Sequence, residues 1–170
     1  MKKLLIVVDM QNDFLTGSLA NAEAERVIAN VKQKLEKARA ESIEVVFTRD
    51  THFENYLSTQ EGKNLPVPHC IKGTWGWEIA DGLYRCGERV FDKPVFGSAE
   101  LANFVKEGGY DEVEVVGVCT DICVVSNVLL IKAYCPETVV RVDGSCCAGV
   151  TVESHECALK TMSACQVTVL

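Results

Sequence analysis

The chain has 170 residues, of which 48% are hydrophobic and 24% are charged, a composition typical of one globular domain with a substantial core. Seventeen Lys and Arg residues against 24 Asp and Glu residues give a net charge of −7, which disfavours a nucleic-acid partner. The first apolar run, Leu4–Val8, is shorter than the about 7–15 residues of a secretory signal, and no run reaches the about 18 residues of a membrane span. We therefore expect a single domain over residues 1–170, located in the cytoplasm, with no membrane partner.

Short apolar runs alternate with amphipathic segments along the chain. Leu4–Val8 is typical of a strand buried on both faces, and Ala22–Ala40 has apolar residues at helical spacing. Further strands are predicted at Glu44–Thr48, Arg89–Asp92, Glu112–Val116, Thr138–Val142 and Gln166–Leu170. Further helices are predicted at Trp77–Leu83 and Thr151–Ala164, with one that begins at Ser98 and one that runs from Thr120 or Asp121 to about Ala133. This alternation predicts an α/β fold, a doubly wound parallel sheet of about six strands with helices on both faces.

Residues with reactive side chains follow three of the predicted strands. Asp9 comes after the first strand, Lys93 after the third, and the segment Gly117–Cys123 after the fourth. Ligands of an open parallel sheet bind beyond the carboxyl ends of its strands, so these residues are expected at one edge. A thiol nucleophile needs a group that takes its proton and a cation that favours the thiolate. Asp9, Lys93 and Cys123 are therefore the candidate catalytic residues.

Cys123 is the candidate nucleophile among nine cysteines, none of which forms a Cys-x-x-Cys pair. With Thr120 as the N-cap, Cys123 is the third residue of a helix, where free N–H groups and the helix dipole favour a thiolate. The N–H groups of Cys119 and Cys123 can also receive an oxyanion. The alternative is that Cys123 is an ordinary small core residue. The vicinal pair Cys146-Cys147, placed after the fifth strand, has no predicted function.

The irregular stretch between Arg49 and Trp77 contains a candidate metal site. Asp50 and His52 are two residues apart, and His69 lies in the same loop, which thus holds two of the three histidines in the chain. One carboxylate and two imidazoles suit zinc, manganese or iron. Alternatively, Asp50 caps a turn and both histidines are polar loop residues. Phe14 and Trp75 are candidates to line an apolar substrate pocket, although core packing is the commoner role of such residues.

Three motifs resemble those of the isochorismatase-like cysteine hydrolase superfamily. Val7–Phe14 resembles the opening motif with the catalytic base, Asp92-Lys93 the segment with the catalytic lysine, and Gly117–Val124 the nucleophile motif. The resemblance spans nearly the whole chain and implies a Rossmann-like three-layer domain in which Asp9, Lys93 and Cys123 form the catalytic triad. It also implies a cis peptide bond between Val118 and Cys119.

The metal loop resembles that of the nicotinamidases within this superfamily. Asp50-x-His52 and Pro68–Thr74 resemble the segment whose divalent ion helps to hold the pyridine nitrogen of the substrate. The resemblance implies zinc, with manganese or iron as alternatives, and no organic cofactor. Many nicotinamidases have a further histidine at a position within Asn55–Ser58, where this chain has none. Some members use a glutamate nearer the last histidine, and Glu61 is the candidate for that role.

The function implied is hydrolysis of a small amide substrate, nicotinamide to nicotinate and ammonia, through a thioester on Cys123. The family commonly forms dimers or tetramers, so a homo-oligomer is expected. The alternative enzyme is a metal-free member of the superfamily that hydrolyses a ureido or carbamoyl compound. The alternatives outside enzymes are a receiver-like module, although no adjacent acid pair follows the first strand, and a catalytically silent scaffold. A dinucleotide-binding domain is disfavoured because Asp9–Phe14 lacks the Gly-x-Gly-x-x-Gly turn.

Overall fold

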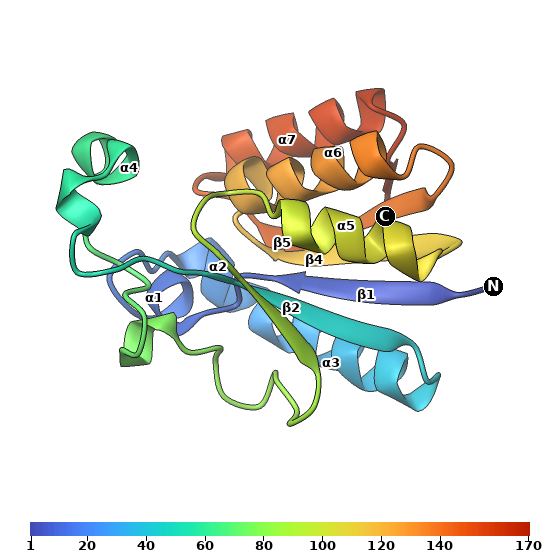
Figure 1. Cartoon of the computed structure of the whole chain (residues 1–170), viewed down its shortest axis with the longest axis horizontal. Coiled ribbons are helices and arrows are strands. Elements are labelled where there is room, and N and C mark those ends of the chain that lie inside the picture. The colour runs from blue at the N-terminus through green and yellow to red at the C-terminus, as the bar shows by residue number, and fades with distance from the viewer.

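Six parallel strands form one sheet in the order β3-β2-β1-β4-β5-β6 in the computed structural model, which describes residues 1–170 (Figure 1). The strands are β1 (Lys3–Val8), β2 (Glu44–Asp50), β3 (Arg89–Lys93), β4 (Glu112–Val118), β5 (Val139–Ala148) and β6 (Thr168–Val169). The chain starts in the middle of the sheet, builds outward to β3, and returns past β1 to build the other half. This arrangement confirms the predicted doubly wound α/β fold.

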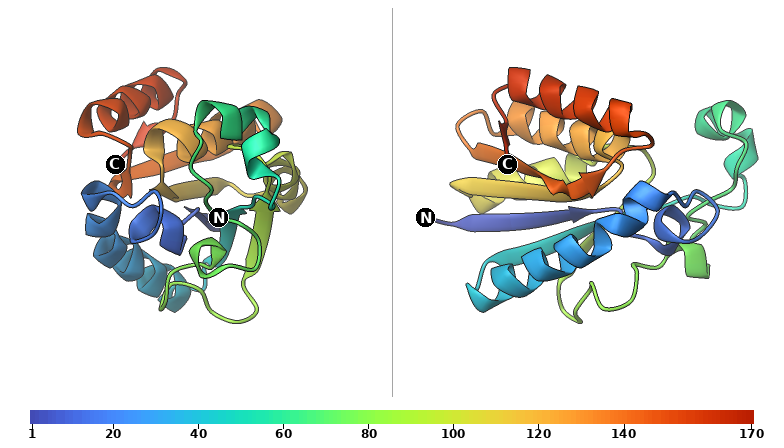
Figure 2. Two further views of the ribbon diagram at one scale, coloured as in Figure 1. Left: turned by 90° about the vertical axis from the view of Figure 1, so that its left-hand side faces the viewer. Right: turned by 180° about the vertical axis from the view of Figure 1, so that it is seen from behind.

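Helices cover both faces of the sheet, so the molecule has three layers (Figures 1 and 2). On one face lie α2 (Ala22–Arg26) and α3 (Ile28–Ala40), and on the other lie α5 (Ala99–Gly108), α6 (Val125–Tyr134) and α7 (Val152–Ala164). The short helices are α1 (Asn12–Leu15) and α4 (Gln60–Asn64), with 3₁₀ turns at Tyr56–Ser58 and Trp75–Trp77 and a π-helical turn at Thr120–Val124. No helix of this structure combines the length and apolar character needed to cross a membrane.

Several predicted element boundaries are wrong. The helix expected at Ala22–Ala40 is interrupted at Val27, which is buried in the core between α2 and α3. Trp77–Leu83 is not a helix, because the Ala80 N–H donates to the Met10 carbonyl and the Glu78 carbonyl accepts from the Asn12 N–H. These two backbone groups of Glu78 and Ala80 are thus hydrogen-bonded to the loop after β1 instead of to helical neighbours.

The last two strands also differ from expectation. β5 continues to Ala148, so Cys146 and Cys147 lie within it as buried free thiols rather than after it. β6 has only two residues, Thr168 and Val169, because only these pair with the edge of β5.

The two central strands approach each other closely where the catalytic candidates follow them. Gly117 in β4 has a φ of 120°, and a Cβ atom built on it would lie 2.1 Å from the Val8 carbonyl oxygen of β1. No other amino acid fits at this position without moving the strands apart. The register of β4 on β5 also shifts between Val115 and Gly117. Asp9 follows Val8 directly, so this contact sets the spacing between the ends of β1 and β4.

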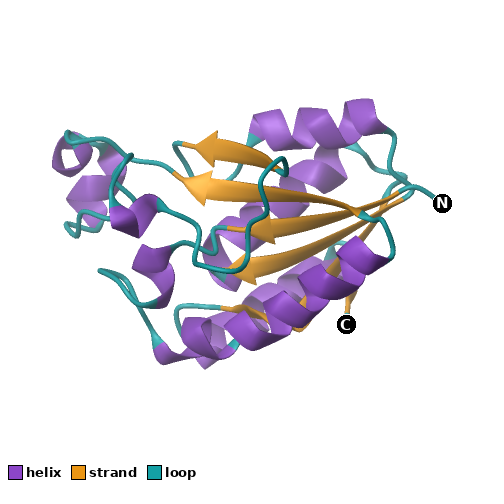
Figure 3. Ribbon diagram, turned by 90° about the horizontal axis from the view of Figure 1, so that it is seen from below, coloured by secondary structure: helices purple, strands orange, loops and turns teal.

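Buried polar side chains gather at the carboxyl ends of the strands, whereas the sheet centre is packed by apolar residues. The apolar residues Leu4–Val8 of β1 belong to a cluster of 38 buried hydrophobic residues. The connecting segment between β2 and β3, which contains α4, lies beyond the arrowheads of the strands (Figure 3). The buried polar residues near that end are Asp9, Gln11, Thr48, Asp50, Thr51, His52, His69, Lys93, Ser98, Thr120 and Asn127. Because buried polar groups are costly without partners, this concentration indicates a functional site.

Candidate active site

Lys93 lies at the centre of a buried group formed by the three candidate catalytic residues. Its Nζ atom is 2.6 Å from Asp9 Oδ2 and 3.4 Å from Cys123 Sγ, and all three residues are at least nine-tenths buried. The Val95 carbonyl oxygen accepts a further hydrogen bond from Nζ at 3.3 Å. The structure thus brings together the three residues that the sequence placed at separate strand ends.

Thr48 holds the carboxylate of Asp9 in position. The Thr48 hydroxyl, on the neighbouring strand β2, donates to Asp9 Oδ1 at 2.6 Å, and the Asp9 N–H lies 3.2 Å from the same hydroxyl oxygen. Asp9 itself has a φ of 48°, which turns the chain away from the strand direction. With one oxygen bound to Thr48 and the other to Lys93, the carboxylate has a single defined orientation.

The three groups shift one another's proton affinities. Burial raises the pKa of Asp9, against the opposing charge of Lys93. Burial also raises the pKa of the Cys123 thiol, and the Asp9 charge adds to this while Lys93 opposes it. For Lys93, burial would lower the pKa, but Asp9 and Cys123 outweigh it and hold the pKa above its usual range. The resting site therefore holds an ammonium beside a protonated thiol, and a carboxylate with increased proton affinity that is suited to a general base.

Cys123 lies in the first turn after β4, but the turn is not the one predicted. Cys119 rather than Thr120 is the N-cap, and its carbonyl oxygen accepts from the N–H groups of Ile122 and Val124 at 3.1 and 3.0 Å. The Thr120 hydroxyl is not a cap because it is paired with His155 Nδ1 at 2.8 Å. Cys123 is thus the fourth residue of a π-helical turn, one position later than expected.

The backbone before the turn provides a donor for an oxyanion. The peptide bond between Val118 and Cys119 is cis, as the resemblance implied. The N–H of Cys119 donates no hydrogen bond to another protein group. An N–H that is free in the resting site can bind an oxygen that becomes negative during the reaction.

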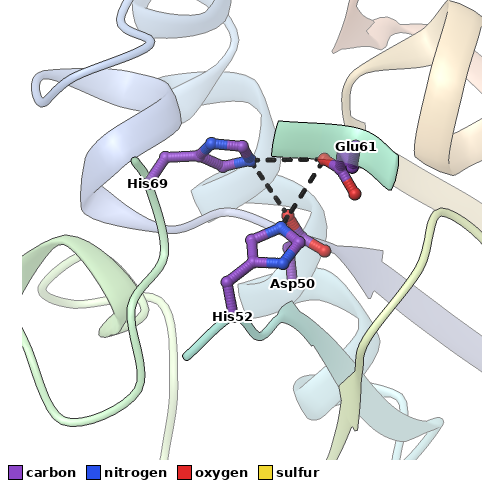
Figure 4. A group of neighbouring side chains, drawn as sticks. All are labelled: Asp50, His52, Glu61 and His69. Atoms are coloured by element: carbon purple, nitrogen blue, oxygen red, sulfur yellow. Dashed lines mark hydrogen bonds and ion pairs between the residues drawn. The ribbon is translucent and has the colours of Figure 1, made fainter. Parts of the chain in front are cut away.

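Asp50, His52, Glu61 and His69 form a second cluster of ionisable side chains (Figure 4). Asp50 ends β2, His52 follows it, His69 returns from the long loop, and Glu61 comes from α4; one donor atom from each lies within 4.8 Å of the others. His52 Nε2 and His69 Nε2 lie 3.0 and 3.4 Å from Asp50 Oδ2, and each lies 3.6 Å from Glu61 Oε1. The structure therefore brings together all four candidate metal ligands.

The donor set fits a divalent metal ion. Four ligands at about 2.0–2.1 Å from a tetrahedral ion are roughly 3.3 Å apart, within the range of the four measured separations. His69 Nδ1 donates to the Val67 carbonyl oxygen at 2.8 Å, which fixes the imidazole ring with Nε2 facing the cluster. Burial would raise the pKa of Asp50, but hydrogen bonds from His52 and His69 and the charge of Lys93 hold it below its usual range, so the carboxylate is ionised for binding.

Asp50 joins the two clusters. Its Oδ2 atom faces the histidines, while its Oδ1 atom lies 3.4 Å from Lys93 Nζ. The backbone of Asp50 is fixed by Gln11, whose side chain accepts from the Asp50 N–H at 2.7 Å and donates to its carbonyl at 2.9 Å. The metal-binding candidates and the catalytic triad are therefore parts of one rigid arrangement.

A cavity of about 500 Å³ lies over both clusters. Cys119, Ile122 and Cys123 line one side, and Asp50, Glu61 and His69 line another. Phe14 lines it as predicted from the sequence, but Trp75 does not: its side chain is 63% exposed and lies outside the lining. The remaining walls are mostly apolar and include Leu19, Leu65, Phe96 and Val150.

The sequence-family comparison decides the classification of this fold and site. The isochorismatase domain model matches residues 3–170. The chain belongs to the isochorismatase family.

Relatives within the isochorismatase family resemble this chain over most of their length. A nicotinamidase/pyrazinamidase from Mycobacterium tuberculosis is 33% identical, with 72% of this chain and 74% of that protein covered. A nicotinamidase from Saccharomyces cerevisiae is 26% identical over 83% of this chain and 86% of that protein. The crystal structure of a pyrazinamidase from Pyrococcus horikoshii in complex with zinc superposes with a TM-score of 0.86 at 28% identity, covering 100% of this chain and 99% of that chain.

Three residues that shape the site of this isochorismatase-family chain were not among those predicted from the sequence. Thr48 orients Asp9, Phe96 lines the cavity, and Asn127 is 1% exposed and bonded to the backbone of the nucleophile turn. Two of them had a visible signal, since Thr48 follows the apolar run Val45–Phe47 and Asn127 is a polar residue in a mostly apolar helix. A polar residue at such a buried position needs a partner.

Proposed function

We propose that this protein is a cysteine-dependent amidohydrolase that converts nicotinamide to nicotinate and ammonia through a thioester on Cys123. The observation that carries the proposal is the position of Lys93 Nζ, 2.6 Å from the Asp9 carboxylate and 3.4 Å from Cys123 Sγ. The relatives named above support an amide of an aromatic ring as substrate. The cavity, with reactive sulfur on one side and four metal-binding donors on another, suits such a ring.

The first half of the reaction forms the thioester. Asp9 accepts the thiol proton as Cys123 Sγ attacks the carboxamide carbon, and the Lys93 ammonium stabilises the negative charge on sulfur. The oxygen of the tetrahedral intermediate receives hydrogen bonds from the N–H groups of Cys119 and Cys123. When the C–N bond breaks, Asp9 returns the proton to the leaving nitrogen, which departs as ammonia.

The second half releases the acid. Water attacks the thioester carbon, and Asp9 accepts a proton from this water. The C–S bond then breaks, nicotinic acid leaves and ionises to nicotinate in solvent, and the proton held by Asp9 passes to the Cys123 sulfur, so the resting state is restored. General acid–base assistance of this kind contributes about 10²–10⁴-fold, and one oxyanion donor about 10²–10³-fold.

The donor cluster is assigned to a resident divalent metal ion. We propose that Asp50, His52, His69 and Glu61 hold zinc, with manganese or iron as alternatives. The bound ion would supply a Lewis-acid site for the ring nitrogen of the substrate. The protein's own contribution is to orient the ring between this cluster and Cys123, with Phe14 in the apolar wall.

Replacing Cys123 with alanine tests the proposal. The rate of nicotinamide hydrolysis, measured by the release of ammonia, should fall by at least about 10³-fold because the nucleophile is lost. The thermal midpoint should stay near that of the parent, and mass spectrometry of acid-quenched parent enzyme should find a nicotinoyl adduct on Cys123. Cys86→Ala, at an exposed cysteine outside the cavity, is the matched control and should retain parent activity. Substantial turnover by Cys123→Ala would contradict the mechanism.

The second candidate activity is hydrolysis of a small ureido or carbamoyl compound by the same triad. The four metal-binding donors beside the cavity favour the aromatic heterocycle, because its ring nitrogen can use a bound cation. Turnover of N-carbamoylglycine without turnover of nicotinamide would select the second candidate. Cytoplasmic location and assembly into a homo-oligomer stay predictions from the sequence.

A further inference from the structure

A buried amide, Asn127 of α6, connects the turn that carries Cys123 to the loop that follows Lys93. Its side chain is 1% exposed, and each of its polar atoms is bound to backbone. Nδ2 donates to the Cys123 carbonyl oxygen at 2.8 Å and to the Phe96 carbonyl oxygen at 3.1 Å. Oδ1 accepts from the Ser98 N–H at 2.9 Å. Two carbonyls and one N–H around a single amide leave only one orientation of the group.

The segment on the far side of Asn127 is the loop that follows Lys93. The Val95 carbonyl oxygen in this loop accepts from Lys93 Nζ at 3.3 Å, and the side chain of Phe96 lines the cavity. The loop also lies directly against α6, since a Cβ atom on Gly97 would be 2.6 Å from Leu130 Cδ1. Its position relative to α6 is therefore set by close packing as well as by the Asn127 hydrogen bonds.

The segment on the near side is the π-helical turn that carries Cys123. Asn127 lies four positions after Cys123, so its side chain reaches back to the carbonyl one turn earlier. The 3.4 Å contact between Lys93 Nζ and Cys123 Sγ joins the end of β3, which leads directly into this loop, to the turn. A shift of the turn against the loop changes this distance directly.

We infer that Asn127 is a positioning residue that holds Cys123 and the loop after Lys93 in register, so that the lysine stays within reach of the sulfur. This role rests on the proposed function, in which Lys93 stabilises the sulfur anion. Asn127 itself touches neither the reacting atoms nor the cavity. Its loss should therefore slow reactions of the thiol much more than it weakens substrate binding.

Two substitutions separate the hydrogen bonds of Asn127. Asn127→Leu removes all three bonds at similar size. Asn127→Asp keeps an oxygen for the Ser98 N–H but removes the donor to Cys123 and Phe96, so it also carries the test if the leucine variant does not fold. For both variants we expect alkylation of Cys123 by iodoacetamide at pH 7.5 to be about 10- to 100-fold slower than in the parent, the range expected for loss of a buried hydrogen bond.

Steady-state kinetics with nicotinamide give the second measurement. In both variants kcat should fall about 10- to 100-fold while KM changes less than about threefold, since a positioning defect acts mainly on the chemical steps. Alkylation of Cys123 does not depend on the substrate. If the parent does not hydrolyse nicotinamide but the variants label slowly, the proposed function fails and the positioning role stands.

Met162→Ala is the matched control for a general loss of stability. Met162 is fully buried near the end of α7, at the amino edge of the sheet and outside the site. This variant should lower the thermal midpoint while Cys123 labels at the parent rate. The inference is overturned if folded Asn127 variants label Cys123 at the parent rate, or if Met162→Ala slows labelling as much as they do.

Discussion

Removing the charge of Lys93 tests how the buried site is held together. Lys93→Met keeps the length of the side chain but removes the ammonium, whose Nζ lies 2.6 Å from Asp9 and 3.4 Å from Asp50. Both carboxylates are almost completely buried. Without the ammonium, the buried carboxylates of Asp9 and Asp50 have no cation between them. Uncompensated buried charges of this kind strongly destabilise a folded protein.

The distances give the scale of the effect. At an effective dielectric constant of about 20, unit charges at these separations attract by roughly 5–6 kcal/mol for each pair. Much of this is offset by the cost of burying the charges, so breaking the arrangement should lower the free energy of unfolding by about 3–5 kcal/mol. The ammonium also stabilises the charge on sulfur in the proposed mechanism, and methionine cannot replace it in this role. Activity should therefore be lost together with stability.

Urea unfolding, followed by circular dichroism, measures the loss. Lys72→Met is the matched control, since this lysine is 49% exposed and pairs with Asp92 at 3.3 Å; it should cost less than about 1 kcal/mol. Adding Asp9→Asn to Lys93→Met removes one unpaired charge and should restore at least about 1 kcal/mol without restoring activity. The reasoning is refuted if Lys93→Met costs no more than Lys72→Met, or if the double variant is no more stable than the single one.

Two further predictions concern the donor cluster. Glu61→Gln should weaken zinc binding at least about tenfold in a chelator competition assay. Glu54→Gln, at an exposed glutamate of the same segment between β2 and β3, should leave zinc affinity unchanged. Equal zinc affinities of the two variants would remove Glu61 from the ligand set. In metal-free protein, the parent should be more stable to urea than Asp50→Asn at pH 7. Because the folded pKa of Asp50 lies below the ordinary value of 3.8, this advantage should shrink as the pH falls below about 4; an advantage that grows on acidification would contradict the assignment.

The catalytic candidates could be found from the sequence because parallel strands end at the same edge. Asp9, Lys93 and Cys123 are far apart along the chain, but each follows a short apolar run, and the alternation of runs and helices predicts the sheet. The same reasoning placed Asp50 and His52 near this edge. Topology alone therefore brought the residues together, without any knowledge of their contacts.

The local geometry of the nucleophile turn could not be predicted in the same way. Thr120 is a common type of N-cap residue, but its hydroxyl is taken by His155, which lies 35 residues later. Trp75 was predicted in the pocket because it is aromatic and lies in the functional loop, yet that loop turns it outward. Both errors arise where a contact distant in sequence decides the conformation of a short segment.

Gly117 has a consequence for how members with this architecture can diverge. The separation of base and thiol is fixed by main chain, where a hydrogen atom of Gly117 faces the Val8 carbonyl. Cavity-lining residues such as Phe14, Leu65 and Phe96 can then be substituted to accommodate a different acyl group, while the position of the attacking sulfur stays the same. Substrate selectivity and thiol reactivity therefore depend on different residues. The residues that set selectivity can change without altering the geometry of the thiol.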